Sequence, residues 1–221
     1  MSEKIRAIIT GVTGMVGEGV LHECLQNPQV EAVLVIGRKP CGVSDPKLKE
    51  IVIPDLANLS TVEGQLPGYS ACFFCAGISS VGMKEAEFKK MTYDLTLSFA
   101  TTLSRVNPDM TFCYISGAGT DSSEKGRMMW ARVKGKTEND LMKLPFADVY
   151  AFRPAFMLPT KGLKNTLPYY RYVTWLYPVF RPLLPQYFGT LKELGVAMIR
   201  SATKGSDKKV LEAKDIARLA S

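Results

Sequence analysis

The stretch from Ile5 to Gly19 most constrains what this chain can fold into. An apolar segment, Ile5 to Ile9, is followed by Gly11, Gly14 and Gly17 and then by a helical pattern. Glycines at this spacing allow a sharp strand-to-helix reversal, a close approach of backbone N–H groups to a pyrophosphate, and tight packing of the helix on a sheet. Because a strand precedes the turn and a helix follows it, the motif favours dinucleotide binding over a purely structural turn.

Apolar runs of strand length recur along the chain and alternate with segments of helical periodicity. This alternation indicates parallel strands joined by helical crossovers. The predicted fold is therefore α/β, a doubly wound parallel sheet of the Rossmann-like, three-layer type, with ligand at the C-terminal strand ends. The six main predicted strands are Ile5–Ile9, Ala32–Ile36, Ile51–Ile53, Ala71–Ala76, Thr111–Ile115 and Val149–Phe152.

Length and composition predict one domain. The chain has 221 residues, of which 46% are hydrophobic and 22% charged, typical of an ordinary globular protein. Residues 1–221 are expected to form a single NAD(P)-binding domain with a small substrate-side extension, residues 155–189. No apolar signal core follows Met1, no long apolar run occurs, and the five cysteines lack regular spacing. We therefore expect no membrane span and a cytoplasmic protein.

The basic residues are dispersed although the formal net charge is +7. A nucleic-acid-binding protein concentrates such charge in a patch, so nucleic acid is not expected as a partner. A need to neutralise cofactor phosphates accounts for part of the excess. No metal site is predicted.

The end of the second predicted strand bears on cofactor choice. Arg38 lies 21 residues beyond Gly17, with Lys39 next to it. An NAD-selective site usually places an acidic residue here, whereas arginine can pair with a 2′-phosphate, so the sequence favours NADP while NAD remains possible. A solvent-exposed loop arginine is the alternative. Asp55, after the third strand, could border the adenine or cap a helix starting near Leu56.

Small and polar residues end the next two strands. Cys75, Ala76 and Gly77 form a turn that a cofactor ribose could approach closely. Cys72 and Cys75 are spaced like a redox pair, but residues three apart in a strand point to opposite faces, so buried thiols are expected. Ser116 ends the fifth strand and places a hydroxyl at the substrate edge.

Several segments together resemble the atypical short-chain dehydrogenase/reductase superfamily. Within it, the chain is similar to the small single-domain proteins related to the Tat-interacting oxidoreductase. The resemblance covers nearly the whole chain and implies a Rossmann-like fold and an NAD(P) cofactor. It is carried by Thr10–Gly17, Gly37–Arg38, Cys75–Gly77, Tyr114–Ser116, Val133–Gly135 and Arg153–Phe156.

The resemblance also implies catalytic roles. Ser116 would polarise a substrate carbonyl, and Lys134 would hold the nicotinamide ribose. A tyrosine four residues before the lysine would relay the proton, but Trp130 stands at that position. An indole N–H donates a hydrogen bond and has no acid–base equilibrium near neutral pH, so Trp130 cannot replace the phenol.

Arg153 and Pro154 follow the sixth predicted strand. They resemble a segment that lies along the nicotinamide, although a Pro-terminated strand edge is an equal alternative. The complete predicted cofactor-binding set is Gly11, Thr13, Gly14, Met15, Val16, Gly17, Arg38, Lys39, Asp55, Cys75, Ala76, Gly77, Lys134, Arg153 and Pro154.

The stretch from Leu167 to Phe188 is unusually rich in aromatic residues. It holds eight aromatic residues and four prolines, while Arg171 and Arg181 interrupt its apolar run. The prolines prevent one long helix, and the arginines exclude a membrane span. Three roles remain open: an aromatic wall of a substrate pocket, a contact with a second subunit, another protein or a membrane surface, and plain core packing.

Two functions from different classes follow. The first is an NADP-dependent oxidoreductase acting on a small carbonyl or quinone-like substrate. The second is a non-catalytic NADP(H)-binding regulatory or scaffold protein, which the missing tyrosine favours. A sugar-nucleotide epimerase or dehydratase shares the glycine pattern, but the C-terminal part of this chain is short for that class.

Overall fold

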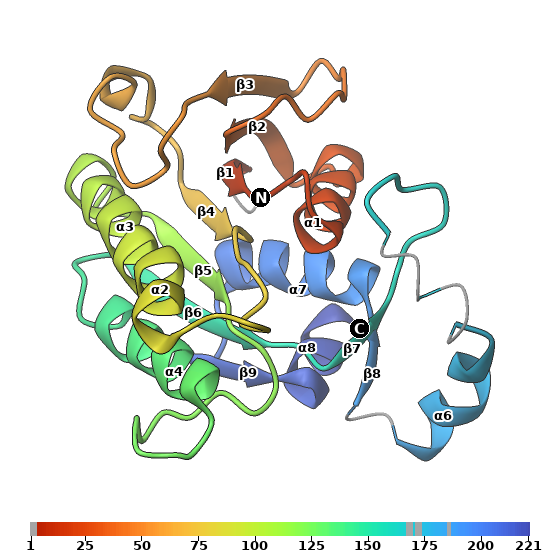
Figure 1. The fold of residues 1–221 in the computed structure, drawn as a ribbon. Coiled ribbons are helices and arrows are strands. Elements are labelled where there is room, and N and C mark those ends of the chain that lie inside the picture. Colours follow the sequence, from red (N-terminus) through yellow and green to blue (C-terminus); the bar gives the residue numbers. More distant parts are fainter. Residues whose placement is uncertain (1–3, 167–169, 171–173, 185–186) are drawn as a thin grey trace.

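Seven strands form a parallel sheet at the centre of the molecule (Figure 1). The computed structural model describes residues 4–166, 170, 174–184 and 187–221, and the sheet lies within them. The strand order is β3-β2-β1-β4-β5-β6-β9, so the order reverses between β1 and β4. The strands are β1 (Ile5–Thr10), β2 (Val30–Gly37), β3 (Leu48–Val52), β4 (Ala71–Phe74), β5 (Thr111–Ile115), β6 (Asp148–Arg153) and β9 (Val210–Glu212).

Helices cover both faces of the sheet and give three layers (Figure 1). On one face lie α1 (Met15–Gln26), α7 (Leu191–Lys204) and α8 (Ala213–Ala220). On the other lie α2 (Glu85–Lys89), the π-helical turn η2 (Lys90–Asp94), α3 (Leu95–Val106) and α4 (Met129–Leu141). A short 3-10 helix, η1 (Glu63–Gln65), precedes β4.

The apolar strands bury side chains on both faces. In β1, Ala7 and Ile9 enter the core beneath α1 and α7, while Ile8 enters the core on the opposite face. In β2, Val33 enters the first of these cores and Leu34 enters the core on the opposite face. Continuous apolar runs are therefore required, and the predicted doubly wound, three-layer fold is confirmed.

Local predictions are confirmed in most places. All six main predicted strands are present. The helices α2 and α3 form one continuous helical stretch, in which η2 widens the middle. Cys72 lies in one core and Cys75 packs against the other, and both thiols are free. Burial raises the pKa of the Cys72 thiol. The thiols therefore lie on opposite faces of the sheet, as predicted.

Of the two roles that the sequence left open for Asp55, the helix cap is not formed. No helix starts near Leu56; the chain makes a turn there, and the Asp55 carboxylate accepts a hydrogen bond from the Ala57 N–H at 2.9 Å. Asp55 thus closes an Asx turn, which the same residue type forms as readily as a helix cap.

The described residues between 156 and 190 form an arm beside α1 and α7. Its two short strands, β7 (Phe156–Leu158) and β8 (Phe188–Thr190), pair in parallel, and between them lie η3 (Thr174–Leu176) and α6 (Tyr177–Leu183). Tyr169, Tyr172, Pro168 and Pro185, which the sequence also singled out, lie outside the described residues. Across the described parts of the chain, no helix combines the length and apolar character needed to traverse a bilayer.

Candidate functional site

The turn between β1 and α1 depends on two glycines. Gly11 has a φ of 71°, and a Cβ there would lie 2.5 Å from the carbonyl carbon of Cys75. A Cβ on Gly17 would lie 2.2 Å from the carbonyl oxygen of Gly11. At Gly14 the nearest atom would be 3.4 Å away, which is ordinary contact. Gly11 and Gly17 therefore hold the turn together, whereas Gly14 leaves space over it.

A cleft of about 760 Å³ opens at this turn, where the strand order reverses. Its volume is within the range of small-molecule and cofactor pockets, and a topological reversal is where parallel sheets bind ligands. The N-terminal end of α1 borders it, with N–H groups unpaired by the helix. Its lining is Gly11, Val12, Thr13, Gly14, Met15, Val16, Gly17, Gly37, Arg38, Lys39, Leu56, Cys75, Ala76 and Gly77.

The cleft unites most of the predicted cofactor-binding set. The ends of β1, β2 and β4 meet there, so residues far apart in sequence share one wall. Val12, Gly37 and Leu56 also line the cleft but were absent from the prediction. Leu56 could have been found as the buried apolar residue that follows the third strand. Asp55, Lys134, Arg153 and Pro154 do not line this cleft.

Arg38 and Lys39 supply the positive charge at one end of the cleft. Both side chains are exposed, and neither makes an ion pair or side-chain hydrogen bond within the described part of the chain. Their charges are therefore available to an anionic group in the cleft.

Ser116 and Lys134 meet one strand away from the cleft wall. The Lys134 ammonium donates to the main-chain carbonyl of Ser116, and the Ser116 hydroxyl donates to the Phe152 carbonyl at 3.1 Å. Burial lowers the pKa of Lys134 to about 8, although Glu138 opposes this shift. The two predicted residues are thus together, with both polar groups engaged by the main chain.

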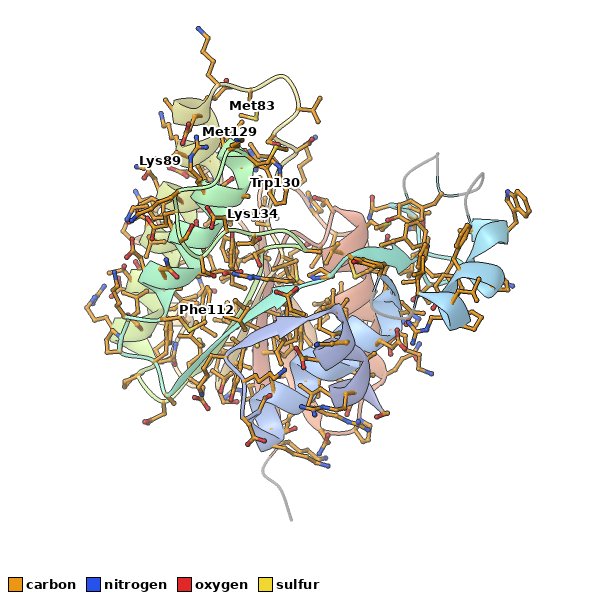
Figure 2. The ribbon with its side chains drawn as sticks, turned by 90° about the horizontal axis from the view of Figure 1, so that it is seen from below. Met83, Lys89, Phe112, Met129, Trp130 and Lys134 are labelled. Atoms are coloured by element: carbon orange, nitrogen blue, oxygen red, sulfur yellow. The ribbon has the colours of Figure 1, made fainter. Side chains whose placement is uncertain are left out.

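Trp130 lies one helical turn before Lys134 on α4 (Figure 2). Its Cη2 atom is 3.4 Å from the position that a Cβ on Gly119 would occupy, so the indole packs on the loop after β5. Gly135 brings α4 against the same loop, since a Cβ there would lie 1.8 Å from the Asp121 carbonyl oxygen. The indole therefore has a packing role where the resemblance placed a proton relay.

Arg153 is surrounded by other side chains. Its guanidinium donates to Glu138 and Ser122, and to Glu212 at 3.1 Å, and the Glu138 side chain is 1% exposed. The carbonyl of Pro154 accepts from Ala118 N–H at 2.9 Å. These contacts tie β6 to the loop after β5, which accounts for Arg153 as a structural residue. Its predicted place along a nicotinamide stays a prediction.

Glu18, in the first turns of α1, was missed by the sequence reasoning. Its carboxylate accepts from the main-chain N–H groups of Lys164 at 2.8 Å and Asn165 at 2.7 Å, and the residue is 8% exposed. The loop that follows β7 is thereby anchored to the helix that borders the cleft. Nothing in the sequence pattern links residues so far apart.

Part of the aromatic arm forms a small core of its own. Phe156 packs on Tyr170 and on Phe188, with ring centroids 5.1 and 5.4 Å apart. Phe180 stacks on Phe188 at 5.6 Å. Core packing therefore accounts for some of these aromatic residues, while the other predicted roles stay predictions.

Comparison with known proteins agrees with this architecture. No protein-family model matches the chain. It is 27% identical over 167 residues to the protein named FMP52, mitochondrial, of Debaryomyces hansenii, which covers 73% of this chain and 72% of the relative. The solved structure of Bordetella bronchiseptica WbmF with NAD⁺ superposes with a TM-score of 0.66 and 16% identity, over 99% of this chain and 77% of WbmF.

A Burkholderia cenocepacia short-chain dehydrogenase in complex with NADP also superposes with a TM-score of 0.66. The two sequences are 15% identical, and the superposition covers 99% of this chain and 93% of the Burkholderia protein. In fold, and in the motifs that carry the resemblance, the chain is similar to proteins of the short-chain dehydrogenase/reductase superfamily. Its departure from the resemblance is Trp130.

The expectation of a cytoplasmic protein is contradicted by the relatives. The FMP52 proteins of Debaryomyces hansenii, Scheffersomyces stipitis, Candida albicans and Candida glabrata are all named as mitochondrial. The prediction rested on the lack of an apolar signal core and of a long apolar run, together with irregularly spaced cysteines, and these features do not distinguish one reducing compartment from another.

Proposed function

We propose that this protein is an NADP-dependent oxidoreductase that reduces a small carbonyl or quinone-like compound. The observation that carries the proposal is the cleft, in which the glycine turn, the N-terminal end of α1 and the two unpaired cations Arg38 and Lys39 lie along one wall. The solved structures of similar fold support a nicotinamide dinucleotide in general, since WbmF is in complex with NAD⁺ and the Burkholderia cenocepacia protein with NADP.

The lining residues fit such a cofactor. Backbone N–H groups at the N-terminal end of α1 would hold the pyrophosphate, because Gly14 has no Cβ and leaves space over them. Arg38 and Lys39 would pair with a 2′-phosphate, and the turn from Cys75 to Gly77 would border a ribose. When bound, the cofactor supplies the hydride.

Lys134 would supply the proton that Trp130 cannot. One N–H of its ammonium donates to the Ser116 carbonyl, which leaves two donors free. Transfer of one of these protons to the carbonyl oxygen, together with hydride addition at carbon, completes reduction to the alcohol, and solvent restores the ammonium. Ser116 would turn its hydroxyl from Phe152 to the substrate carbonyl. A lysine pKa of about 8 is in the range that suits general acid catalysis.

The pH dependence of NADPH oxidation with a panel of carbonyl and quinone acceptors tests this role. Below pH 8 Lys134 holds its proton and the rate is constant; above pH 8 the donor form is lost, so the rate falls about tenfold per pH unit. Lys134→Arg keeps the positive charge but not a transferable proton, so it should retain NADPH binding and lose turnover. The matched control, Lys136→Arg on the outer side of α4, should leave the profile unchanged.

Two results would contradict the proposal. One is the absence of turnover with every acceptor, combined with gain of activity in Trp130→Tyr. The other is a rate that does not respond to pH between 7 and 10 while Lys134→Arg remains active.

A non-catalytic NADP(H)-binding regulatory protein is the second candidate. It is favoured by the engagement of both Ser116 and Lys134 with main-chain carbonyls and by the indole at position 130. This candidate expects NADPH to raise the melting temperature without being consumed. Steady NADPH oxidation that disappears in Ser116→Ala would refute it.

A further inference from the structure

The arm between β7 and β8 exposes an unusual share of the molecule's apolar surface. Among the described residues, eight large hydrophobic side chains are exposed, and four of them lie between positions 174 and 187. Trp175 is 70% exposed, Leu183 69%, Tyr187 55% and Leu184 38%. We call these four residues the outer apolar face.

Other residues of the same segment already pack against the rest of the arm and α7. Phe180 and Tyr177 pack on Phe188 in the aromatic core of the arm. Arg181 pairs with Glu193 and donates to the Phe188 carbonyl, which fixes α6 to the start of α7. Figure 1 shows α6 standing away from the central sheet, beyond β8. Trp175, Leu183 and Tyr187 each remain more than half exposed, so the outer apolar face is open to a partner.

The segment that carries this face has no acidic residue of its own. From Val149 to Lys192 the sequence has no Asp or Glu but six Lys and Arg residues. Arg153 and Arg181 are paired with glutamates from other segments. Lys161, Lys164 and Lys192 make no ion pair within the part of the chain that the structure describes. Unpaired positive charge thus accompanies the exposed apolar residues along the arm.

We propose that the outer apolar face docks peripherally on an anionic lipid bilayer, with Lys161, Lys164 and Lys192 attracted to the headgroups. Tryptophan and tyrosine favour the boundary between headgroups and acyl chains, because one part of each ring system is apolar and another is polar. Leu183 and Leu184 would enter the acyl boundary beside them. The proposal does not depend on whether the cleft performs redox chemistry.

A second copy of the chain suits this face less well. A symmetric dimer places the same patch of each subunit against the other. Both patches would then bring a segment that lacks acidic residues and carries unpaired lysines, so like charges would face each other across the contact. An anionic bilayer has the complementary charge and needs no matching shape.

Co-sedimentation of the full chain with large vesicles tests the proposal. One set is made of phosphatidylcholine alone, and another contains about one-third phosphatidylserine, which gives the surface the negative potential that attracts basic segments. We expect binding to the anionic vesicles, several times weaker binding to the neutral ones, and loss of binding as salt is raised, since the Debye length shortens. Brominated lipids should quench Trp175 fluorescence when the protein is bound.

Two sets of variants separate the apolar and electrostatic contributions. Trp175→Ser combined with Leu183→Ser should weaken binding about tenfold or more, given the apolar area withdrawn from water. Val81→Ser is the matched control, because Val81 is 87% exposed but lies outside the arm. Lys161→Gln and Lys192→Gln should each weaken binding to anionic vesicles about fivefold. All these side chains are surface groups, so melting temperatures should stay near that of the parent.

Three outcomes would overturn the proposal. The first is no binding to anionic vesicles at low salt. The second is binding that Trp175→Ser with Leu183→Ser and the lysine variants leave unchanged. The third is a dimer in analytical ultracentrifugation that dissociates in Trp175→Ser with Leu183→Ser, which would assign the face to a second copy.

Discussion

The two halves of the candidate site differ in whether glycine backbone contacts or side-chain contacts determine their shape. On the side of β1, β2 and β4, which we call the backbone-built half, five of the residues that line the cleft are glycines, and the close backbone contacts at Gly11 and Gly17 leave no space for a Cβ. On the side of β5, β6 and α4, side chains determine the arrangement, with Arg153, Glu138 and Lys134 at its centre. The backbone-built half can be recognised in the sequence from the spacing of its glycines. In the half that depends on side chains, which we call the side-chain-built half, a different residue at one position, such as Trp130, is enough to change the chemistry.

Removing the buried carboxylate of Glu138 should have the largest effect on the side-chain-built half. Glu138→Ala leaves the buried guanidinium of Arg153 with only Glu212 and Ser122, so we expect the free energy of unfolding to fall by about 4 kcal/mol. Urea denaturation measures this change. Glu85→Ala is the matched control, because the Glu85 side chain in its pair with Arg132 is 50% exposed and the loss should be under about 1 kcal/mol. Equal losses in the two variants would contradict the structural role of Arg153.

Two glycine substitutions should separate folding from binding in the backbone-built half. Gly17→Ala places a methyl group 2.2 Å from the Gly11 carbonyl oxygen, so we expect a loss of about 2–3 kcal/mol in unfolding free energy together with loss of NADPH binding. Gly14→Ala makes only ordinary contacts, so its stability should stay within about 1 kcal/mol of the parent while NADPH affinity falls. Thermal denaturation with and without NADPH measures both quantities. Unchanged NADPH affinity in Gly14→Ala would place the cofactor elsewhere.

The smallest of these effects concerns cofactor choice. Arg38→Ala should weaken NADPH binding about tenfold, or about 1.4 kcal/mol, and leave NADH binding unchanged, because only the 2′-phosphate would pair with the guanidinium. Isothermal titration with the two cofactors gives the ratio directly. A tenfold loss for both cofactors would show that Arg38 acts on a group common to them, and no loss for either would make it a solvent-exposed loop residue.

Most of the fold could be predicted from the sequence, because an uninterrupted run of apolar residues indicates a strand that is buried on both faces. Ala32 to Ile36, for example, is apolar without interruption, as a strand covered on both faces must be. The glycine turn and the residues from Cys75 to Gly77 were found for a related reason, since their roles depend on small size at a strand end. The residues that line the cleft are correspondingly the ones that local sequence describes best.

The remainder of the site could not be predicted because it depends on contacts between distant segments. The pairing of Arg153 with Glu138 and Glu212 joins three elements, and no sequence interval signals it. Asp55 shows the complementary difficulty, because an aspartate after a strand can close a turn or cap a helix with the same local hydrogen bond. The expectation of a cytoplasmic protein was wrong because the lack of an apolar signal core and the irregular cysteine spacing do not distinguish the cytoplasm from another reducing compartment.

The carboxylate of Glu18 also limits how this scaffold can be modified. This carboxylate accepts hydrogen bonds from the main-chain N–H groups of Lys164 and Asn165. The segment from the end of β7 to these residues therefore has a set length, whatever its side chains are. Insertions between the end of β7 and position 164 should therefore be rejected, because they would lengthen a path that the Glu18 carboxylate holds at a set length.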